Sequence, residues 1–169
     1  MFMNKILRYS FIMLLALICN FAFAGEATID FTKLTISATD DGYTIKSSDF
    51  TFSAVKNGGS NKPTQNANAK DLRHYAKNSL TISGAKMTKI VFAMSDAGVK
   101  QWAEITASEG TIKIDQDSKT TTWENAAGST TITLTVGDKN QYGTNTSKTA
   151  GQFDINSAII TSDGQGGGT

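Results

Sequence analysis

The feature that most constrains the fold of this chain is a hydrophobic period of two residues. In the segment Thr130–Val136, the apolar residues Ile132, Leu134 and Val136 alternate with threonines. Such alternation puts the apolar side chains on one face of a β-strand and the polar ones on the other. Residues 80–82 and 111–114 alternate in the same way, so several half-buried strands are predicted.

Other short apolar segments extend this pattern. Lys89–Met94 is apolar on both faces and predicts a strand near the middle of a sheet. Ile29 and Phe31 occupy odd-numbered positions, whereas Leu34 and Ile36 occupy even-numbered ones. In one continuous strand the two pairs would point to opposite faces, so a break in the strand is predicted between them. Further strands are predicted at 43–45, 50–55, 102–107, 120–124 and 153–161. Residues 96–104 favour a turn leading into a strand over a helix.

Turn residues separate these segments. Asp41-Gly42, Glu109-Gly110 and Gly137-Asp138 are typical of tight turns. Two long polar loops are predicted at 56–70 and 138–151. The chain therefore predicts an all-β fold, an antiparallel β-sandwich or jelly roll of about nine or ten short strands. Its predicted shared core comprises Leu80, Ile82, Ile90, Phe92, Ile132, Leu134 and Val136.

The first 24 residues have the three parts of a secretory signal. Lys5 and Arg8 precede the apolar run Phe11–Cys19, and Ala22-Phe23-Ala24 offers small residues for cleavage before Gly25. A membrane anchor and a lipoprotein signal ending at Cys19 are the alternatives. We expect a signal peptide at 1–24, one β-sandwich domain at 25–162 and a disordered glycine-rich tail at 163–169. The protein would then be secreted or held at the cell surface.

Charge and cysteine content exclude several classes of function. Without Lys5 and Arg8, the 16 basic residues fall to 14 against 15 acidic ones, and no basic stripe stands out. Binding of nucleic acid needs clustered cations, so that class is set aside. The one cysteine lies in the signal, so the mature chain is expected to have no disulfide and no thiolate. No membrane span is expected after cleavage, and no cofactor is predicted.

One stretch resembles a known type of module. Asp71-Leu72-Arg73-His74-Tyr75-Ala76-Lys77-Asn78-Ser79-Leu80-Thr81-Ile82-Ser83 is followed by Met87-Thr88-Lys89-Ile90-Val91-Phe92, and later by Trp123 ahead of a threonine-rich strand. This order is similar to β-sandwich modules in secreted and surface proteins of gut-dwelling Gram-negative bacteria. The resemblance covers roughly residues 29 to 162. It implies the fold type and leaves the activity open.

The sequence contains few combinations of residues typical of catalytic or metal-binding sites. His74 is the single histidine, so a histidine-based triad or a multi-histidine metal site is not predicted. In a strand it would point away from Arg73 and Tyr75, and we expect it on the solvent face. Asp115-Gln116-Asp117 and Asp40-Asp41 could supply calcium ligands, but a solvated turn is the favoured interpretation of each. The chain is predicted not to be an enzyme, and no metal ligand is assigned.

Aromatic side chains give the best functional lead. Tyr142 lies in a polar loop and is flanked by the amides Asn140, Gln141 and Asn145, the residue types that bind sugars. Arg73 and Tyr75 share a strand face and could form part of a cleft. Trp102 and Trp123 are more often core residues in a sandwich than binding platforms.

Two hypotheses follow from these residues. The first is an exported, non-catalytic binding module, carbohydrate-binding or glycan-adhesive, with Tyr142, Asn140, Gln141, Asn145, Arg73 and Tyr75 as ligand-binding residues. The second is a structural or protein-interaction module at the cell surface, without a small-ligand site. Two or more exposed aromatic rings on one concave face or loop end would favour the first. Two buried tryptophans with Tyr142 standing alone would favour the second.

Overall fold

The computed structural model describes residues 25–163, so the predicted signal peptide and the tail beyond Asp163 lie outside the described residues. Eleven strands of this range form one sheet, and all pairings between them are antiparallel. The predicted all-β, antiparallel class is confirmed. The elements are β1 (Gly25–Asp30), η1 (Phe31–Lys33), β2 (Ser37–Ala38), β3 (Gly42–Ser47), β4 (Phe50–Val55), β5 (Thr64–Gln65), β6 (Leu72–Tyr75), β7 (Ser79–Met94), α2 (Asp96–Lys100), β8 (Ala103–Ala107), β9 (Thr111–Asp115), β10 (Thr120–Asn140) and β11 (Gln152–Ser162).

Two long strands, β7 and β10, run antiparallel and bend together. The first part of β7 pairs with the last part of β10, with Leu80 opposite Leu134, and the second part of β7 pairs with the first part of β10, with Ile90 opposite Trp123. Segments 80–82 and 89–94, predicted as separate strands, are therefore one strand. The same holds for segments 120–124 and 130–136.

The bend in β10 depends on a glycine. Gly128 has a φ of 69°, and a Cβ added there would lie 2.7 Å from the Lys86 side chain at the bend of β7. A residue with a side chain would be strained by the dihedral angle, and the flexible Lys86 side chain would have to move aside. The two strands can thus turn the corner side by side.

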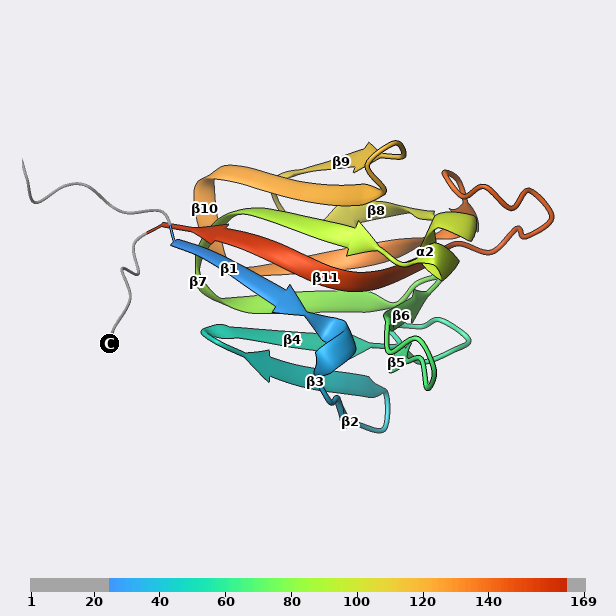
Figure 1. The fold of residues 1–169 in the computed structure, drawn as a ribbon, viewed down its shortest axis with the longest axis horizontal. Coiled ribbons are helices and arrows are strands. Elements are labelled where there is room, and N and C mark those ends of the chain that lie inside the picture. Colours follow the sequence, from blue (N-terminus) through green and yellow to red (C-terminus); the bar gives the residue numbers. More distant parts are fainter. Residues whose placement is uncertain (1–24, 164–169) are drawn as a thin grey trace, which may run out of the picture.

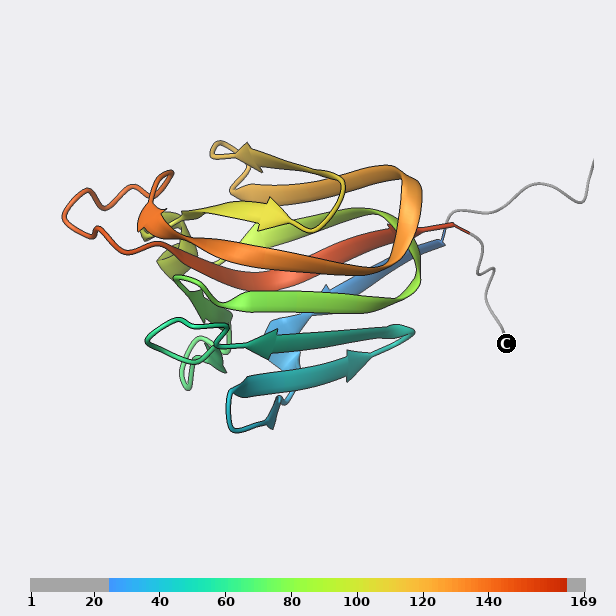
Figure 2. The same ribbon diagram turned by 180° about the vertical axis from the view of Figure 1, so that it is seen from behind.

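This bend divides the sheet into two layers. In one layer the order is β2, β3, β4, the first part of β7, the last part of β10, and β8. In the other it is β9, the first part of β10, the second part of β7, β11 and β1, and the start of β11 also pairs with β6, which pairs with β5. Figure 1 looks onto the layer with β1 and β11, and Figure 2 looks onto the layer with β8. The core lies between the two layers.

The core prediction is confirmed. All seven residues predicted to share the core are buried, with 2% exposure or less. Both tryptophans are fully buried as well: Trp102 Nε1 donates to Thr121 Oγ1 at 3.2 Å, and Trp123 Nε1 donates to the Glu109 carbonyl at 2.7 Å. The change of parity near the N-terminus falls at η1, where a single 3-10 turn interrupts the extended chain.

Two local predictions were wrong. Residues 96–100 form the short helix α2, because the Ser95 hydroxyl caps its first turn by accepting from Gly98 N at 3.1 Å. Gly137-Asp138 is not a turn, because β10 continues through it to pair Asn140 with Ala103 of β8. The long polar loop after β10 is therefore shorter than expected, and it spans residues 141–151.

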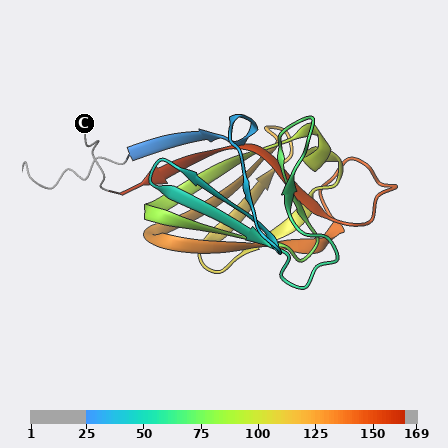
Figure 3. The same ribbon diagram turned by 90° about the horizontal axis from the view of Figure 1, so that it is seen from below.

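The two ends of the molecule differ in character. Gly25 at the start of β1 is paired with Ser162 at the end of β11, so the described chain begins and ends at the same end of the fold. The loops after β4, β5 and β10 gather at the opposite end, which we call the loop end (Figures 1 and 3). Within residues 25–163, no helix is long and apolar enough to cross a membrane.

Candidate functional site

The single histidine is a core residue, contrary to the prediction that it faces solvent. His74 Nδ1 lies 2.7 Å from the Phe153 carbonyl, and Nε2 lies 2.5 Å from the Tyr43 hydroxyl. Since a carbonyl oxygen can only accept, Nδ1 carries the proton and Nε2 accepts from Tyr43. Alternation along β6 correctly predicted that His74 points away from Arg73 and Tyr75, but it did not say which face is buried. With both ring nitrogens engaged inside the core, this histidine has no free nitrogen to offer a substrate.

Behind the exposed face of β6 lies a buried acidic cluster. Arg73 and Asp154 are register partners on β6 and β11, and Arg73 Nε lies 3.2 Å from Asp154 Oδ2. The N–H is not aligned with that oxygen, so the contact is an ion pair without a well-formed hydrogen bond. Asp71, also fully buried, accepts from the Ser95 hydroxyl at 2.8 Å. Neither carboxylate is open to solvent, so neither can serve as a catalytic acid or base for a ligand.

Burial perturbs the titration of these groups in opposite senses. It raises the pKa of Asp154 to about 7, with Arg73 opposing the rise and Asp71 adding to it. It lowers the pKa of His74 to about 4, with the hydrogen bond to the Phe153 carbonyl opposing the fall. For Arg73, burial acts to lower the pKa, but Asp154 and the Tyr75 side chain outweigh it and raise the pKa. Arg73 is therefore held in its charged form beside the buried Asp154.

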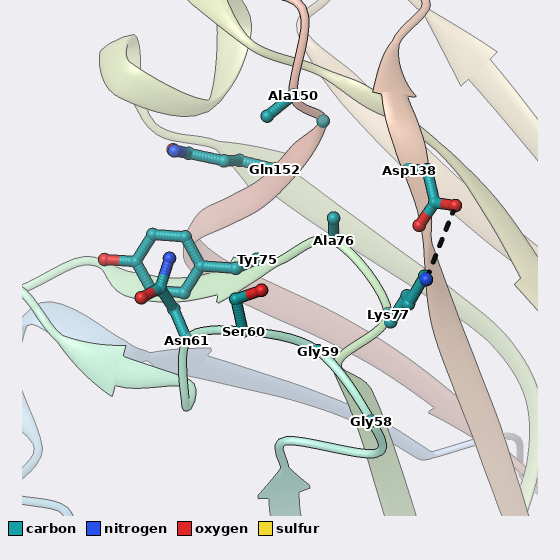
Figure 4. Close-up of a pocket in the computed structure, with 11 residues that line it drawn as sticks. Gly58, Gly59, Ser60, Asn61, Tyr75, Ala76, Lys77, Asp138, Ala150 and Gln152 are labelled. Atoms are coloured by element: carbon teal, nitrogen blue, oxygen red, sulfur yellow. Dashed lines mark ion pairs between the residues drawn. The ribbon is translucent and has the colours of Figure 1, made fainter.

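Tyr75 lies in a hollow at the loop end. The hollow has a volume of about 450 Å³, within the range of small-ligand sites, and its walls come from four separate parts of the chain. Figure 4 shows the Tyr75 ring on one side of the hollow and the Lys77–Asp138 ion pair on the other, with Asn61, Ser60 and Gln152 among the residues that line it. A partly exposed ring thus shares the hollow with amide and hydroxyl groups.

Two features fix the wall of this hollow. Tyr75 and Gln152 are register partners on β6 and β11, so the strand ladder sets their separation. The buried Asn78 ties the loop after β4 to the turn after β6: its Oδ1 accepts from Tyr75 N at 2.8 Å, and its Nδ2 donates to the carbonyls of Lys56 at 3.2 Å and Asn61 at 2.8 Å. The hollow is therefore held by secondary structure and a buried amide.

The predicted site around Tyr142 is a second, separate part of the loop end. The Tyr142 side chain is partly buried against the core, and its backbone N–H donates to the Trp102 carbonyl at 2.9 Å. The Asn140 amide donates to the carbonyls of Asn145 and Lys148, both at 2.9 Å, so it holds the loop together. Asn140 and Gln141 line another hollow, to which neither Tyr142 nor Asn145 contributes.

Of the six residues predicted to bind a ligand, Arg73 and Tyr75 share one face of β6. The other four lie together in and beside the loop after β10: the Asn140 amide donates to the Asn145 carbonyl, and Gln141 Nε2 donates to the Tyr142 hydroxyl at 3.4 Å. Sequence reasoning did not single out Ser60, Asn61 and Gln152. The Gly- and Asn-rich composition of residues 56–70 was the one signal that could have pointed to the first two.

No group of three or more histidine, cysteine or acidic side chains able to hold a metal ion occurs in the part of the chain that the structure describes. Asp115, considered as a calcium ligand, instead closes the turn between β9 and β10. Its Oδ1 accepts from Asp117 N at 3.0 Å and Ser118 N at 3.1 Å, and the hydrogen bonds to Ser118 lower the pKa of Asp115.

Comparison with known proteins identifies no family for this chain. No protein-family model matches the chain, and no curated protein is similar enough to count as a relative.

Proposed function

We propose that this chain is an exported, non-catalytic binding module that takes a carbohydrate in the hollow around Tyr75. The observation that carries the proposal is the half-exposed Tyr75 ring set among the side chains of Asn61, Ser60 and Gln152 (Figure 4). A sugar ring offers an apolar face for an aromatic ring and hydroxyls for amides and hydroxyls. The hollow supplies both kinds of contact in one place.

A binding role fits the chemistry of the site better than a catalytic one. His74 and Asp154, whose pKa values are shifted to about 4 and about 7, are fully buried, so they do not face the hollow. What faces the hollow is one aromatic ring, neutral polar groups and the Lys77–Asp138 ion pair. These groups suit the reversible binding of a ligand that is released without chemical change.

The position of the hollow supports a role in recognition at a surface. The described chain begins and ends at one end of the fold, while the hollow lies at the loop end opposite (Figure 1). Any attachment through a terminus would leave the loop end free to meet a ligand. Loops placed on a rigid scaffold commonly carry binding residues.

A protein-interaction module without a small-ligand site is the second candidate. The burial of both Trp102 and Trp123 favours it, because neither ring is left to form a binding platform. Tyr75 and Tyr142 are both partly exposed near the same end, but they do not line one common hollow. The two candidates therefore differ in whether the protein binds an isolated oligosaccharide.

Binding of the processed protein to an array of oligosaccharides tests the proposal, with two variants at Tyr75. Tyr75→Phe keeps the ring and should retain most of the affinity. Tyr75→Ala removes the ring and should weaken binding at least about tenfold, which corresponds to about 1.4 kcal/mol. If the folded wild-type protein binds no oligosaccharide, the protein-interaction candidate replaces this one. If it binds and Tyr75→Ala binds equally well, the ligand lies elsewhere, and the loop bearing Tyr142 is the next site to test.

Export has its own test. The protein isolated from its host should begin at or near Gly25, as the pattern ending in Ala22-Phe23-Ala24 predicts. N-terminal sequencing that finds Met1 retained, or an acylated Cys19, would refute it.

A further inference from the structure

The hollow around Tyr75 is the middle one of three at the loop end. A second hollow, of about 590 Å³, shares Gly58 and Gly59 with it. A third, of about 460 Å³, shares no lining residue with it, but Lys139 and Thr149 of the third hollow are chain neighbours of Asp138 and Ala150 of the Tyr75 hollow. We call the three hollows together the track; together they are larger than a single sugar ring needs.

Lysines line this track in every part. Lys56 lines the second hollow, Lys77 the Tyr75 hollow, and Lys139 and Lys148 the third. Against these four cations stand two acidic lining residues, Asp41 and Asp138.

Three of these four lysines form no ion pair within residues 25–163. Asp138 lies 4.0 Å from Lys77, whereas Lys56, Lys139 and Lys148 have no ion-pair partner among residues 25–163. The chain from Gly25 onward carries slightly more acidic than basic residues. The track is therefore more positive than the protein as a whole.

We infer that the ligand of the loop end is an acidic polysaccharide, one of whose sugars packs on Tyr75 while its anionic groups lie against Lys56, Lys139 and Lys148. This inference rests on the carbohydrate-binding function proposed above and names its substrate class. Uronate carboxylates and sulfate esters share the chemistry required, since a lysine ammonium on a flexible stem is a point charge that needs no fixed partner geometry. Because these lysines are near the surface, their contribution falls as salt screens the charges.

The test measures affinities of the processed full-length protein for matched oligosaccharides of equal length that are neutral, uronate-bearing or sulfate-bearing. At low salt, one or both acidic series should bind at least about tenfold more tightly than the neutral series, and raising the salt should reduce that preference. Whichever of the two acidic series binds more tightly shows whether the anionic groups of the ligand are carboxylates or sulfates. Tyr75→Ala should weaken binding of the acidic ligand as well, because a sugar ring must still pack there.

The double variant Lys139→Gln/Lys148→Gln should lose at least about fivefold in affinity for the acidic ligand. The matched control is Lys46→Gln, an exposed lysine of β3 that lines none of the three hollows. It should bind as the wild type does.

Three outcomes would overturn the inference, and they differ in whether the proposed carbohydrate-binding function is retained. Equal binding of neutral and acidic sugars, insensitive to salt and to the lysine variants, refutes the acidic ligand but leaves the carbohydrate-binding function standing. Equal binding of a sugar-free polyanion such as polyglutamate, unaffected by Tyr75→Ala, reduces the track to a non-specific cationic surface. Failure to bind any oligosaccharide removes the proposed function, and this inference with it.

Discussion

Two buried groups on facing strands should give opposing contributions to the pH dependence of stability. His74 of β6 and Asp154 of β11 are both fully buried, with pKa values of about 4 and about 7 in the folded protein. Their ordinary values are 6.5 and 3.8. Each group therefore binds its proton at a different pH in the folded and unfolded states, and the difference appears as a slope of stability against pH.

The signs of the two slopes are opposite. Between about pH 4 and 6.5 the unfolded state holds a proton on His74 that the folded state lacks, so this group makes stability rise with pH. Between about pH 4 and 7 the folded state holds a proton on Asp154 that the unfolded state has lost, so this group makes stability fall with pH. Each slope is at most about 1.4 kcal/mol per pH unit, and the two nearly cancel where they overlap.

The variant Asp154→Asn should expose the histidine slope. Relative to wild type, its free energy of unfolding should gain up to about 1.4 kcal/mol for each unit of pH between about 4.5 and 6. Urea unfolding followed by the fluorescence of the buried tryptophans, at half-unit steps of pH, measures this difference. Taking the difference from wild type cancels the titration of all other groups that the variant leaves alone.

Two further variants complete the experiment. His74→Gln should give a difference profile of opposite sign over the same range, because only the Asp154 slope then remains. Asp138→Asn removes an exposed carboxylate and serves as the control, with a profile parallel to wild type. Parallel profiles for Asp154→Asn and wild type would mean that Asp154 is ionised throughout and that Arg73 fully compensates its burial.

Three other predictions concern stability and the hollow. Leu134→Ala should lower the free energy of unfolding, measured in urea, by about 2–5 kcal/mol, the range for a buried leucine. The control Thr131→Ala, on the exposed face of the same strand, should lower it by less than about 0.5 kcal/mol. Equally small losses for both variants would mean that Leu134 does not lie on the buried face. Tyr43→Phe should cost about 1–3 kcal/mol in the same assay, since it leaves the buried Nε2 of His74 without a donor, and an unchanged midpoint would argue against that bond. Asn78→Ala removes three hydrogen bonds at about 1 kcal/mol each and should also speed amide exchange in the loop after β4; exchange as slow as in wild type would mean that other contacts fix the wall.

The fold class and the core were predictable from the sequence because both follow from alternation within a strand. Each apolar residue of the segment 130–136 is buried, as its parity requires. The continuity of β7 and β10 was not predictable. Their middle segments, around Gly84 and Gly128, carry residues typical of turns, yet backbone pairing continues beyond both bends. Glycine and small polar residues occur both where a strand bends and where the chain reverses, so local composition does not distinguish the two.

The burial of His74 shows a different limit. Alternation shows which residues share a face of a strand but not which face is buried, and histidine, which is intermediate in its tendency to be buried, does not settle the choice. Its partners, Tyr43 and Phe153, lie 31 and 79 residues away in sequence. Asn61 and Gln152 likewise lie 14 and 77 residues from Tyr75 in sequence, so the polar residues of this hollow could not be recognised from local composition.

The construction of the hollow bears on how tightly it can bind. Its central pair, Tyr75 and Gln152, is held by the ladder between β6 and β11, and its loop wall is held by the buried Asn78. These groups are thus already ordered before a ligand arrives, so binding there avoids most of the entropy cost of fixing a loop. The neighbouring loop after β10 is held in the same manner, by the hydrogen bonds of the Asn140 amide. An extended ligand lying over both would therefore meet fixed walls beneath it, while the long lysine side chains at the surface remain free to adjust to its charges.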